Sequence, residues 1–281
     1  MTPELAAVVF GLLASAGWGS GDFSGGLATR RMNVFSVVAL SHVIGPFLLT
    51  ALALLSGEAL PPSGDLLWGA LAGMAGVVGL AGLYRGLAIG QAGVVAPVSA
   101  VLAAGIPVLF TAVTRALPDG LQFVGFALGI LGIWLVSGTP RAAGKPSGLQ
   151  MGLIAGVGFG VFFILLDQIA SDAVFWPLVA ARTASSLSML TLVRVRGLEW
   201  RPPNRGMLGL VLLAGVLDIA ANAFFVMATQ AGRLDIAAVV SSLYPAVTVL
   251  LARVLMREHI TNGQYLGIAC GLAAVILIAV G

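Results

Sequence analysis

The chain consists almost entirely of apolar runs, each long enough to cross a membrane as a helix. A bilayer-spanning helix needs about 20 mostly apolar residues, and glycine, proline and charged residues divide this sequence into ten such runs. Lipid offers the backbone no hydrogen-bond partners, so runs of this length must be helical. The predicted fold class is an all-α integral membrane protein with ten transmembrane helices, at residues 4–24, 34–56, 66–89, 93–114, 120–138, 148–170, 174–194, 206–230, 234–254 and 263–280.

The composition excludes a soluble protein and disfavours a nucleic-acid-binding one. Hydrophobic residues make up 59% of the 281 and charged residues 9%, whereas a soluble domain is roughly half apolar and a quarter charged. The net charge is +3, but the basic residues are scattered in short loops rather than gathered on one face. The single cysteine, Cys270, excludes an intramolecular disulfide and a cysteine-based metal cluster. We expect a monomer in a lipid bilayer with a small-molecule partner, no nucleic acid, no cofactor and no metal.

The second half of the chain repeats the first at offsets of 138 to 142 residues. Each half contains five spans, and an odd number of crossings inverts the second half relative to the first. We predict two inverted five-helix repeats, over residues 1–139 and 140–281, in one integrated membrane domain. Such repeats around a midplane site are typical of secondary transporters. The matching stretches are GLLASAGWG at 11–19 with GLIAGVGFG at 152–160, GQAG at 90–93 with TQAG at 229–232, and LQFVGFALG at 121–129 with GQYLGIACG at 263–271.

The basic residues predict which loops face the cytoplasm. The loops after the first, fifth, seventh and ninth spans hold ten Lys or Arg, whereas the loops on the other side hold only Arg115 and Arg233. By the positive-inside rule, the richer set is cytoplasmic, which places both termini outside the cell (inner) membrane. The ten residues are Arg30, Arg31, Arg141, Lys145, Arg194, Arg196, Arg201, Arg205, Arg253 and Arg257.

Short motifs resemble the EamA-like, ten-helix members of the drug/metabolite transporter superfamily. GWGSGDF at 17–23 is similar to their Trp-Gly-Ser-x-x-Phe opening, and residues 241–281 are similar to the end of their repeat. The first half matches more weakly and has Ala116 where the motif has glutamate. The matching positions are Pro107, Gln122 and Gly125 in the first half and Pro245, Glu258, Gln264 and Gly267 in the second.

This resemblance implies a multi-pass carrier with a substrate cavity between its halves, such as an amino-acid exporter of the YddG type. It also implies cytoplasmic termini, whereas the arginine count predicts the opposite. We keep the arginine count for this chain.

Two equivalent helix faces are candidates for lining that cavity. Trp18 and Asp22 share one face of the first span, and the repeat places Phe159 and Phe163 on the matching face of the sixth. Symmetry predicts that Trp18 and Phe159 are facing aromatic walls, although core packing would explain either residue. Asp22 could bind substrate or a proton, but we favour a simpler role, in which it ends the first helix beside the arginines of the next loop.

Polar residues inside the spans are the other site candidates, because a charge at mid-helix costs about 2.5–3.5 kcal/mol and needs a partner or a function. Asp218 and Asn222 share a face of the eighth span, where Asp218 could bind an ammonium group or a proton, or pair with Arg85 or Arg182. Arg182 matches His42 at an offset of 140. A cation there could hold a substrate carboxylate, or pair with Asp22 or Asp167.

Two tyrosines and four prolines complete the candidate set. Tyr84 and Tyr244 offer hydroxyl groups to a cavity, although interfacial anchoring would explain the first and helix packing the second. Prolines inside or near the start of spans free backbone carbonyls and permit bends, so they are candidate gating hinges or simple kinks. They are Pro97, Pro107, Pro177 and Pro245.

The predicted function is secondary transport, by alternating access, of amino acids or similar small metabolites as an exporter or facilitator. One alternative is an intramembrane aspartyl protease that uses Asp22 of its Gly-Ser-Gly-Asp motif with Asp167 or Asp218. We disfavour an enzyme because the accompanying protease motifs and other hydrolase motifs are missing and because catalysis does not explain the repeat. The second alternative is a multidrug efflux carrier for lipophilic cations.

Overall fold

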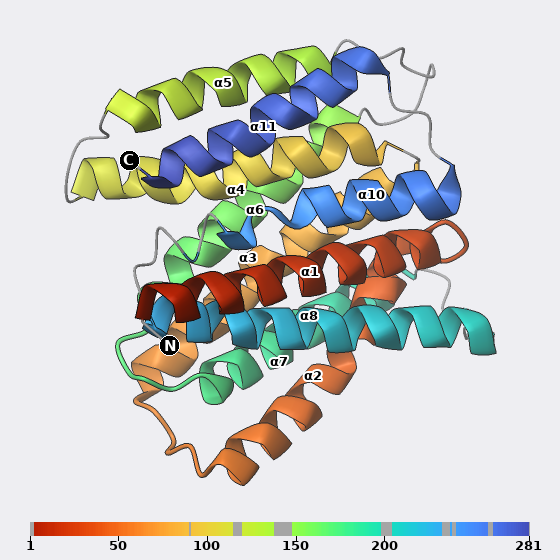
Figure 1. Cartoon of the computed structure of the whole chain (residues 1–281). Coiled ribbons are helices and arrows are strands. Elements are labelled where there is room, and N and C mark those ends of the chain that lie inside the picture. The colour runs from red at the N-terminus through yellow and green to blue at the C-terminus, as the bar shows by residue number, and fades with distance from the viewer. Residues whose placement is uncertain are drawn as a thin grey trace.

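The computed structural model describes residues 3–89, 91–114, 120–137, 148–197, 204–231, 237, 240–257 and 261–280 (Figure 1). Ala116 and Glu258 of the family-like motifs, and five of the basic residues counted above, lie outside these ranges. Within them the secondary structure is helical. The helices are α1 (Pro3–Thr29), α2 (Val34–Ser56), α3 (Ser63–Ala88), α4 (Ala92–Thr114), α5 (Gly120–Ser137), α6 (Gly148–Leu166), α7 (Phe175–Val195), α8 (Arg205–Ala231), α10 (Tyr244–Met256) and α11 (Asn262–Val280).

The ten helices follow the ten predicted spans in order, so the predicted fold class is confirmed. In the described part of the chain, α1, α2, α3, α6, α7 and α8 are long and apolar enough to cross a membrane. The other four contain shorter apolar segments. The boundary between the repeats lies outside the described residues and stays a prediction.

The first and sixth helices end elsewhere than predicted. α1 continues to Thr29 instead of residue 24, because its final turns pack closely on α3. Gly25 and Gly26 lie directly against Tyr84 and Leu87 of that helix. α6 ends at Leu166 instead of residue 170, and the chain then turns toward α7.

The ninth predicted span, residues 234–254, is interrupted within its described part. Val240 and Ser241 are helical, a turn follows, and α10 begins only at Tyr244. Pro245 has no N–H with which to bond the carbonyl of Ser241, and this missing hydrogen bond favours a break at that point. Residues 234–236, 238 and 239 of this span lie outside the described ranges.

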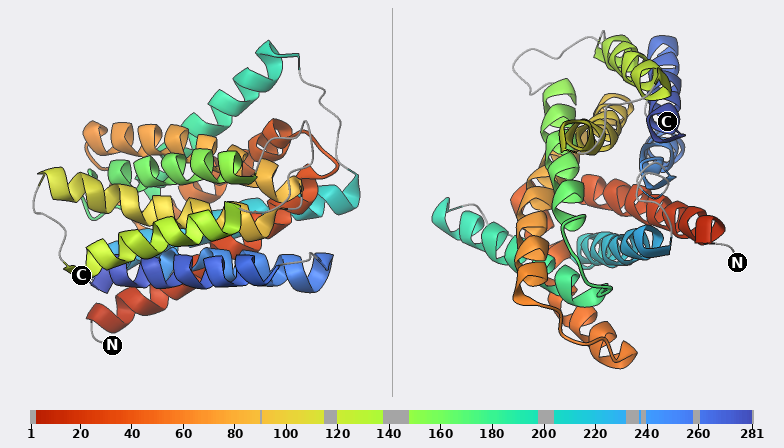
Figure 2. Two further views of the ribbon diagram at one scale, coloured as in Figure 1. Left: turned by 90° about the horizontal axis from the view of Figure 1, so that it is seen from above. Right: turned by 90° about the vertical axis from the view of Figure 1, so that its left-hand side faces the viewer.

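Helices from the two halves interleave and pack reciprocally. α1 runs along α8 as α6 runs along α3, and α4 packs on α6 as α10 packs on α1. α2 meets its counterpart α7, and α5 meets its counterpart α11. Figure 1 shows α5 beside α11 at the top and α1 beside α8 below, and the views in Figure 2 agree. Reciprocal packing of this kind is what a twofold relation between two five-helix repeats gives.

Two glycines fix the register of this relation. Gly73 of α3 lies against the backbone carbonyl of Ala181 in α7, and Gly215 of α8 lies against the carbonyl of Ser41 in α2. A Cβ atom at either glycine would overlap that carbonyl oxygen. Because the two contacts are equivalent, position 76 of α3 corresponds to Asp218 of α8.

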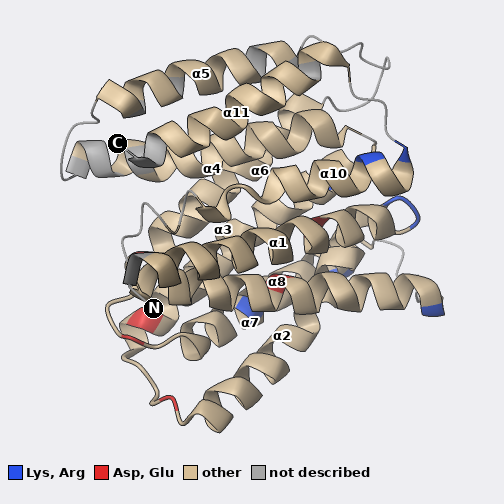
Figure 3. Ribbon diagram, viewed as in Figure 1, with Lys and Arg blue, Asp and Glu red and all other residues tan. Residues whose placement is uncertain are grey.

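Charged side chains mark the two ends of the bundle differently. Both termini lie at one end (Figure 1), and Lys and Arg gather mainly at the opposite end (Figure 3). The acidic residue of the segment that joins α2 to α3 and the one in the first turn of α3 lie at the terminal end (Figure 3). This distribution agrees with the pattern on which the topology prediction was based, and the orientation itself stays a prediction.

Candidate functional site

A cavity lies where helices of both halves meet. Its lining comes from α1, α2, α3, α6, α7, α8 and the first residue of α10, and is mostly apolar. The volume of the cavity that the centre of a water-sized sphere can occupy is about 60 Å³. One water needs roughly 10–15 Å³ by the same measure. The lining residues are Trp18, Asp22, His42, Gly73, Gly76, Leu80, Phe159, Phe162, Phe163, Leu178, Ala181, Arg182, Ser185, Asp218, Asn222 and Tyr244.

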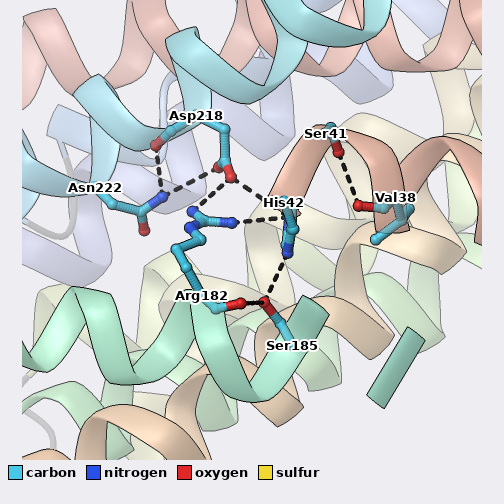
Figure 4. Close-up of polar contacts among 7 residues, drawn as sticks. All are labelled: Val38, Ser41, His42, Arg182, Ser185, Asp218 and Asn222. Atoms are coloured by element: carbon cyan, nitrogen blue, oxygen red, sulfur yellow. Dashed lines mark hydrogen bonds and ion pairs between the residues drawn. The ribbon is translucent and has the colours of Figure 1, made fainter. Parts of the chain in front are cut away.

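Three charged or polar side chains from three helices meet on one wall of the cavity (Figure 4). Arg182 of α7 pairs with Asp218 of α8, with 2.5 Å between Nη2 and Oδ2. Its Nη1 lies 2.8 Å from Nε2 of His42 in α2. The sequence offered Arg85 and Arg182 as possible partners of Asp218, and in the structure the partner is Arg182.

The hydrogen bonds of His42 define which of its ring nitrogens carries a proton. Arg182 can only donate, so Nε2 of His42 accepts and its Nδ1 carries the proton. That Nδ1–H donates to Oγ of Ser185 over 2.8 Å, and the Ser185 hydroxyl donates to the carbonyl of Arg182. His42 is therefore neutral in this arrangement, and it holds the arginine in place rather than adding a second charge.

Asn222 completes this wall one helical turn after Asp218. Its Nδ2 group donates to the Asp218 carbonyl over 2.6 Å and to Oδ1 of the Asp218 carboxylate over 3.1 Å. Both oxygens of that carboxylate are thus engaged, one by Arg182 and one by Asn222. We call Arg182, Asp218, His42, Asn222 and Ser185 the ion-pair wall.

Asp22 forms no hydrogen bond or ion pair with the members of the ion-pair wall. It is two turns inside α1, so the interpretation that it ends the helix is wrong. Its residue is only 5% exposed and it lines the cavity. Among the described residues, its carboxylate forms neither a hydrogen bond nor an ion pair, and Arg182 is engaged elsewhere. Asp22 is therefore a buried carboxylate that only the cavity can supply with a partner.

Aromatic rings form the remaining walls. The Trp18 ring lies 6.0 Å from that of Phe163 and 5.6 Å from that of Phe225. Phe159 packs edge-on against Tyr244, with ring centroids 6.4 Å apart. The structure thus brings Trp18 and Phe159 to one cavity, each against its own neighbours. Phe225 was not predicted, although it shares a helix face with Asp218 and Asn222.

The two tyrosines have different surroundings. Tyr244 lines the cavity, and its hydroxyl lies 2.6 Å from Oγ of Ser99 in α4. Tyr84 is 1% exposed and packs against Gly25 of α1, without lining the cavity. Interfacial anchoring therefore does not explain Tyr84.

The four candidate hinge prolines fall into two groups. Pro97 and Pro107 lie inside α4, where each removes a backbone hydrogen bond. Pro177 and Pro245 lie in the first turns of α7 and α10, where the missing N–H is not needed. The sequence analysis did not single out Pro46, which lies inside α2.

Two carboxylates outside the cavity connect the halves, and sequence reasoning missed both. Glu58 accepts hydrogen bonds from the backbone N–H groups of Val174, Phe175 and Trp176, where α7 begins. Asp65 accepts from the N–H groups of residues 170 and 171. A carboxylate is stabilising at a helix N-terminus. These two residues hold the α6–α7 segment, and hence the start of the helix that carries Arg182.

In the described part of the chain, no group of three or more His, Cys, Asp or Glu side chains could hold a metal ion.

Comparison with known proteins agrees with this architecture. One solved crystal structure matches with a TM-score of 0.65 and 18% identity over 98% of this chain and 96% of its own, which is a likeness of fold. No curated protein matches. The model of the EamA-like transporter family matches twice, over residues 5–138 and 146–280. That family is a family of membrane transporters, not of enzymes. These two matches cover nearly the whole sequence, so the chain belongs to the EamA-like transporter family.

Proposed function

We propose that this protein is a secondary transporter that carries amino acids or similar small amine-bearing metabolites across the cell membrane by alternating access. The observation that supports it most is the cavity between the two halves, which combines aromatic walls with an ion-pair wall and a separate carboxylate. Mostly apolar pockets with a few placed polar groups are typical of small-molecule sites.

The interleaved halves suit such a cycle. The cavity is lined by equivalent helices of both repeats, so a shift of one half against the other changes which end of the bundle is open to it. Pro97 and Pro107 in α4, and the break before α10, are candidate places for bending. Arg182 and Asp218 come from α7 and α8 of the same half, so their ion pair can persist through the cycle.

One observation favours a second candidate, the efflux of lipophilic cations. Asp22 lines the same cavity as Trp18 and Phe163, and a flat organic cation could bind there through both the ionised carboxylate and the ring faces. A dyad protease is less well supported, because two aspartates that share a proton must both be free of a cation. Asp218 is instead paired with Arg182.

Transport into liposomes tests the proposal. Purified protein is reconstituted, and the uptake of labelled amino acids and of a labelled lipophilic cation is measured with and without a proton gradient. We expect saturable amino-acid flux that is absent from protein-free liposomes. Flux of the cation alone would support the second candidate, and no flux of either kind would refute both. Cleavage of a membrane peptide that is lost in Asp22→Asn would revive the protease.

A further inference from the structure

Among the described residues that line the cavity, acidic side chains outnumber Lys and Arg side chains by two to one. Arg182 and Asp218 form an ion pair, and His42 is neutral because it accepts a hydrogen bond from Arg182. Among the described residues that line the cavity, Arg182 is the sole Lys or Arg. When the Asp22 carboxyl group is ionised, it therefore has no compensating cation among the described residues that line the cavity.

A buried carboxylate without a partner is costly, so Asp22 favours whatever positive charge can reach it. The cavity offers that access, because Asp22 lines it. Gly21, the residue before it, lets α1 approach the backbone of α8 closely around Leu217 and Asp218. A charge that compensates Asp22 must then come through the cavity.

The surroundings of Asp22 favour an organic ammonium group over a metal ion. Hard cations such as Ca²⁺ take six or more oxygen ligands, whereas the cavity that Asp22 lines is mostly apolar and includes aromatic rings. Trp18 lies one helical turn before Asp22 on the same face of α1. Phe163, whose ring lies 6.0 Å from that of Trp18, is the residue of the second half that corresponds to Asp22. One carboxylate with ring faces beside it suits an ammonium ion attached to an apolar body.

We infer that Asp22 binds the ammonium group of the transported substrate, while the apolar part of that substrate lies among Trp18, Phe159 and Phe163. This inference rests on the proposed function and names its substrate class, an amine with an apolar or aromatic body. A carboxylate on the substrate is not required, because Arg182 already has Asp218. Amines without a carboxylate therefore bind at least as well as the matching amino acid.

Binding of three matched probes to purified protein in detergent tests this. Phenethylamine carries only the ammonium group, phenylalanine carries both charges, and 3-phenylpropionate carries only the carboxylate. With the unaltered protein we expect phenethylamine and phenylalanine to bind and raise the melting temperature, and 3-phenylpropionate to bind at least tenfold more weakly. Equal binding of 3-phenylpropionate, or no binding of phenethylamine, would overturn the inference.

A carboxylate-to-amide variant locates the effect. Asp22→Asn should weaken phenethylamine binding at least tenfold, and Asp22→Glu, which keeps the charge, should retain part of it. The matched control is Asp172→Asn, since Asp172 is exposed between α6 and α7, and it should bind as the unaltered protein does. Unchanged amine binding in Asp22→Asn overturns the inference. It does so even if transport by that variant no longer responds to a proton gradient.

The liposome experiment separates this result from the proposed function. Amino-acid flux that is the same in Asp22→Asn and the unaltered protein would leave the transporter intact and remove the role of Asp22. Amine binding that depends on Asp22, together with no flux of any amine or amino acid, would support the role of Asp22 and refute the transporter function.

Discussion

The two halves of the cavity share a backbone plan but not a chemistry. In α1 the cavity face carries Trp18 and Asp22, and in α6 the equivalent face carries Phe159 and Phe163. Trp18 corresponds to Phe159, so both halves carry an aromatic ring at this position. Asp22 corresponds to Phe163, so a carboxylate in the first half is replaced by a phenylalanine in the second.

In α3 and α8 the carboxylate belongs to the second half instead. The register set by Gly73 and Gly215 makes Gly76 of α3 the counterpart of Asp218 in α8. The pair that meets between α2 and α7, His42 and Arg182, is polar in both halves and in direct contact. A repeated scaffold has thus diverged into one half-site with an internal ion pair and another whose carboxylate has no cation among the described residues that line the cavity.

The ion-pair wall should be the most sensitive part of this comparison. Arg182→Ala leaves Asp218 as a buried charge without its cation, so we expect a loss of about 3–5 kcal/mol in unfolding free energy. His42→Ala removes a neutral partner and should cost less. Thermal unfolding in detergent measures both, and recovery in the double variant Arg182→Ala with Asp218→Ala would show that the lone charge is the cause. Equal effects of the two single variants would contradict the assignment of His42 as neutral.

The two cavity carboxylates should respond oppositely to the same isosteric change. Asp218→Asn removes the charge that compensates Arg182, and we expect a loss of about 1.5–3 kcal/mol, as for a hydrogen bond to a charged group. Asp22→Asn removes a charge that has no partner among the described residues, so its stability without substrate should be unchanged or higher. Melting temperatures of both variants give the comparison. A lower melting temperature for Asp22→Asn would show that the protein itself stabilises this carboxylate.

The reciprocal glycines test whether the backbone plan is symmetric. Gly73→Ala and Gly215→Ala each place a Cβ atom against a backbone carbonyl, so both should lose about 1–3 kcal/mol. Gly209→Ala is the control, because nothing lies within 4 Å of a Cβ at that position of α8. It should be neutral or slightly stabilising. A large loss in only one of the two contact variants would show that one of these helix contacts is not required for the fold.

The smallest expected effect concerns Tyr244 at the rim of the helix break. Tyr244→Phe keeps the ring against Phe159 and removes the hydroxyl that meets Ser99, so we expect a loss of about 1 kcal/mol. A double-variant cycle with Ser99→Ala isolates the pair. If the two losses simply add, the hydrogen bond contributes nothing to stability.

Much of the candidate site was predictable because helical periodicity fixes which residues share a face. Asp218 and Asn222 were assigned together in this way, and both line the cavity. Phe225 lies on the same face, three residues further on, so the same reasoning reaches it. Glu58 and Asp65 were missed because a loop has no periodicity, and their partners are backbone N–H groups that any residue provides.

The sequence by itself determined the helices, their order and the repeat, because apolar run length and the backbone's need for hydrogen bonds in lipid leave no other structure. It did not determine pairing. Arg182 had three candidate partners in the sequence, Asp22, Asp167 and Asp218, and only the packing of α7 against α2 and α8 brought it to Asp218 and to His42. The same packing left Asp22, inside α1, without a bonded partner in the described part of the chain. Charge pairing depends on distances of a few ångströms between separate helices, and those distances are set by tertiary contacts.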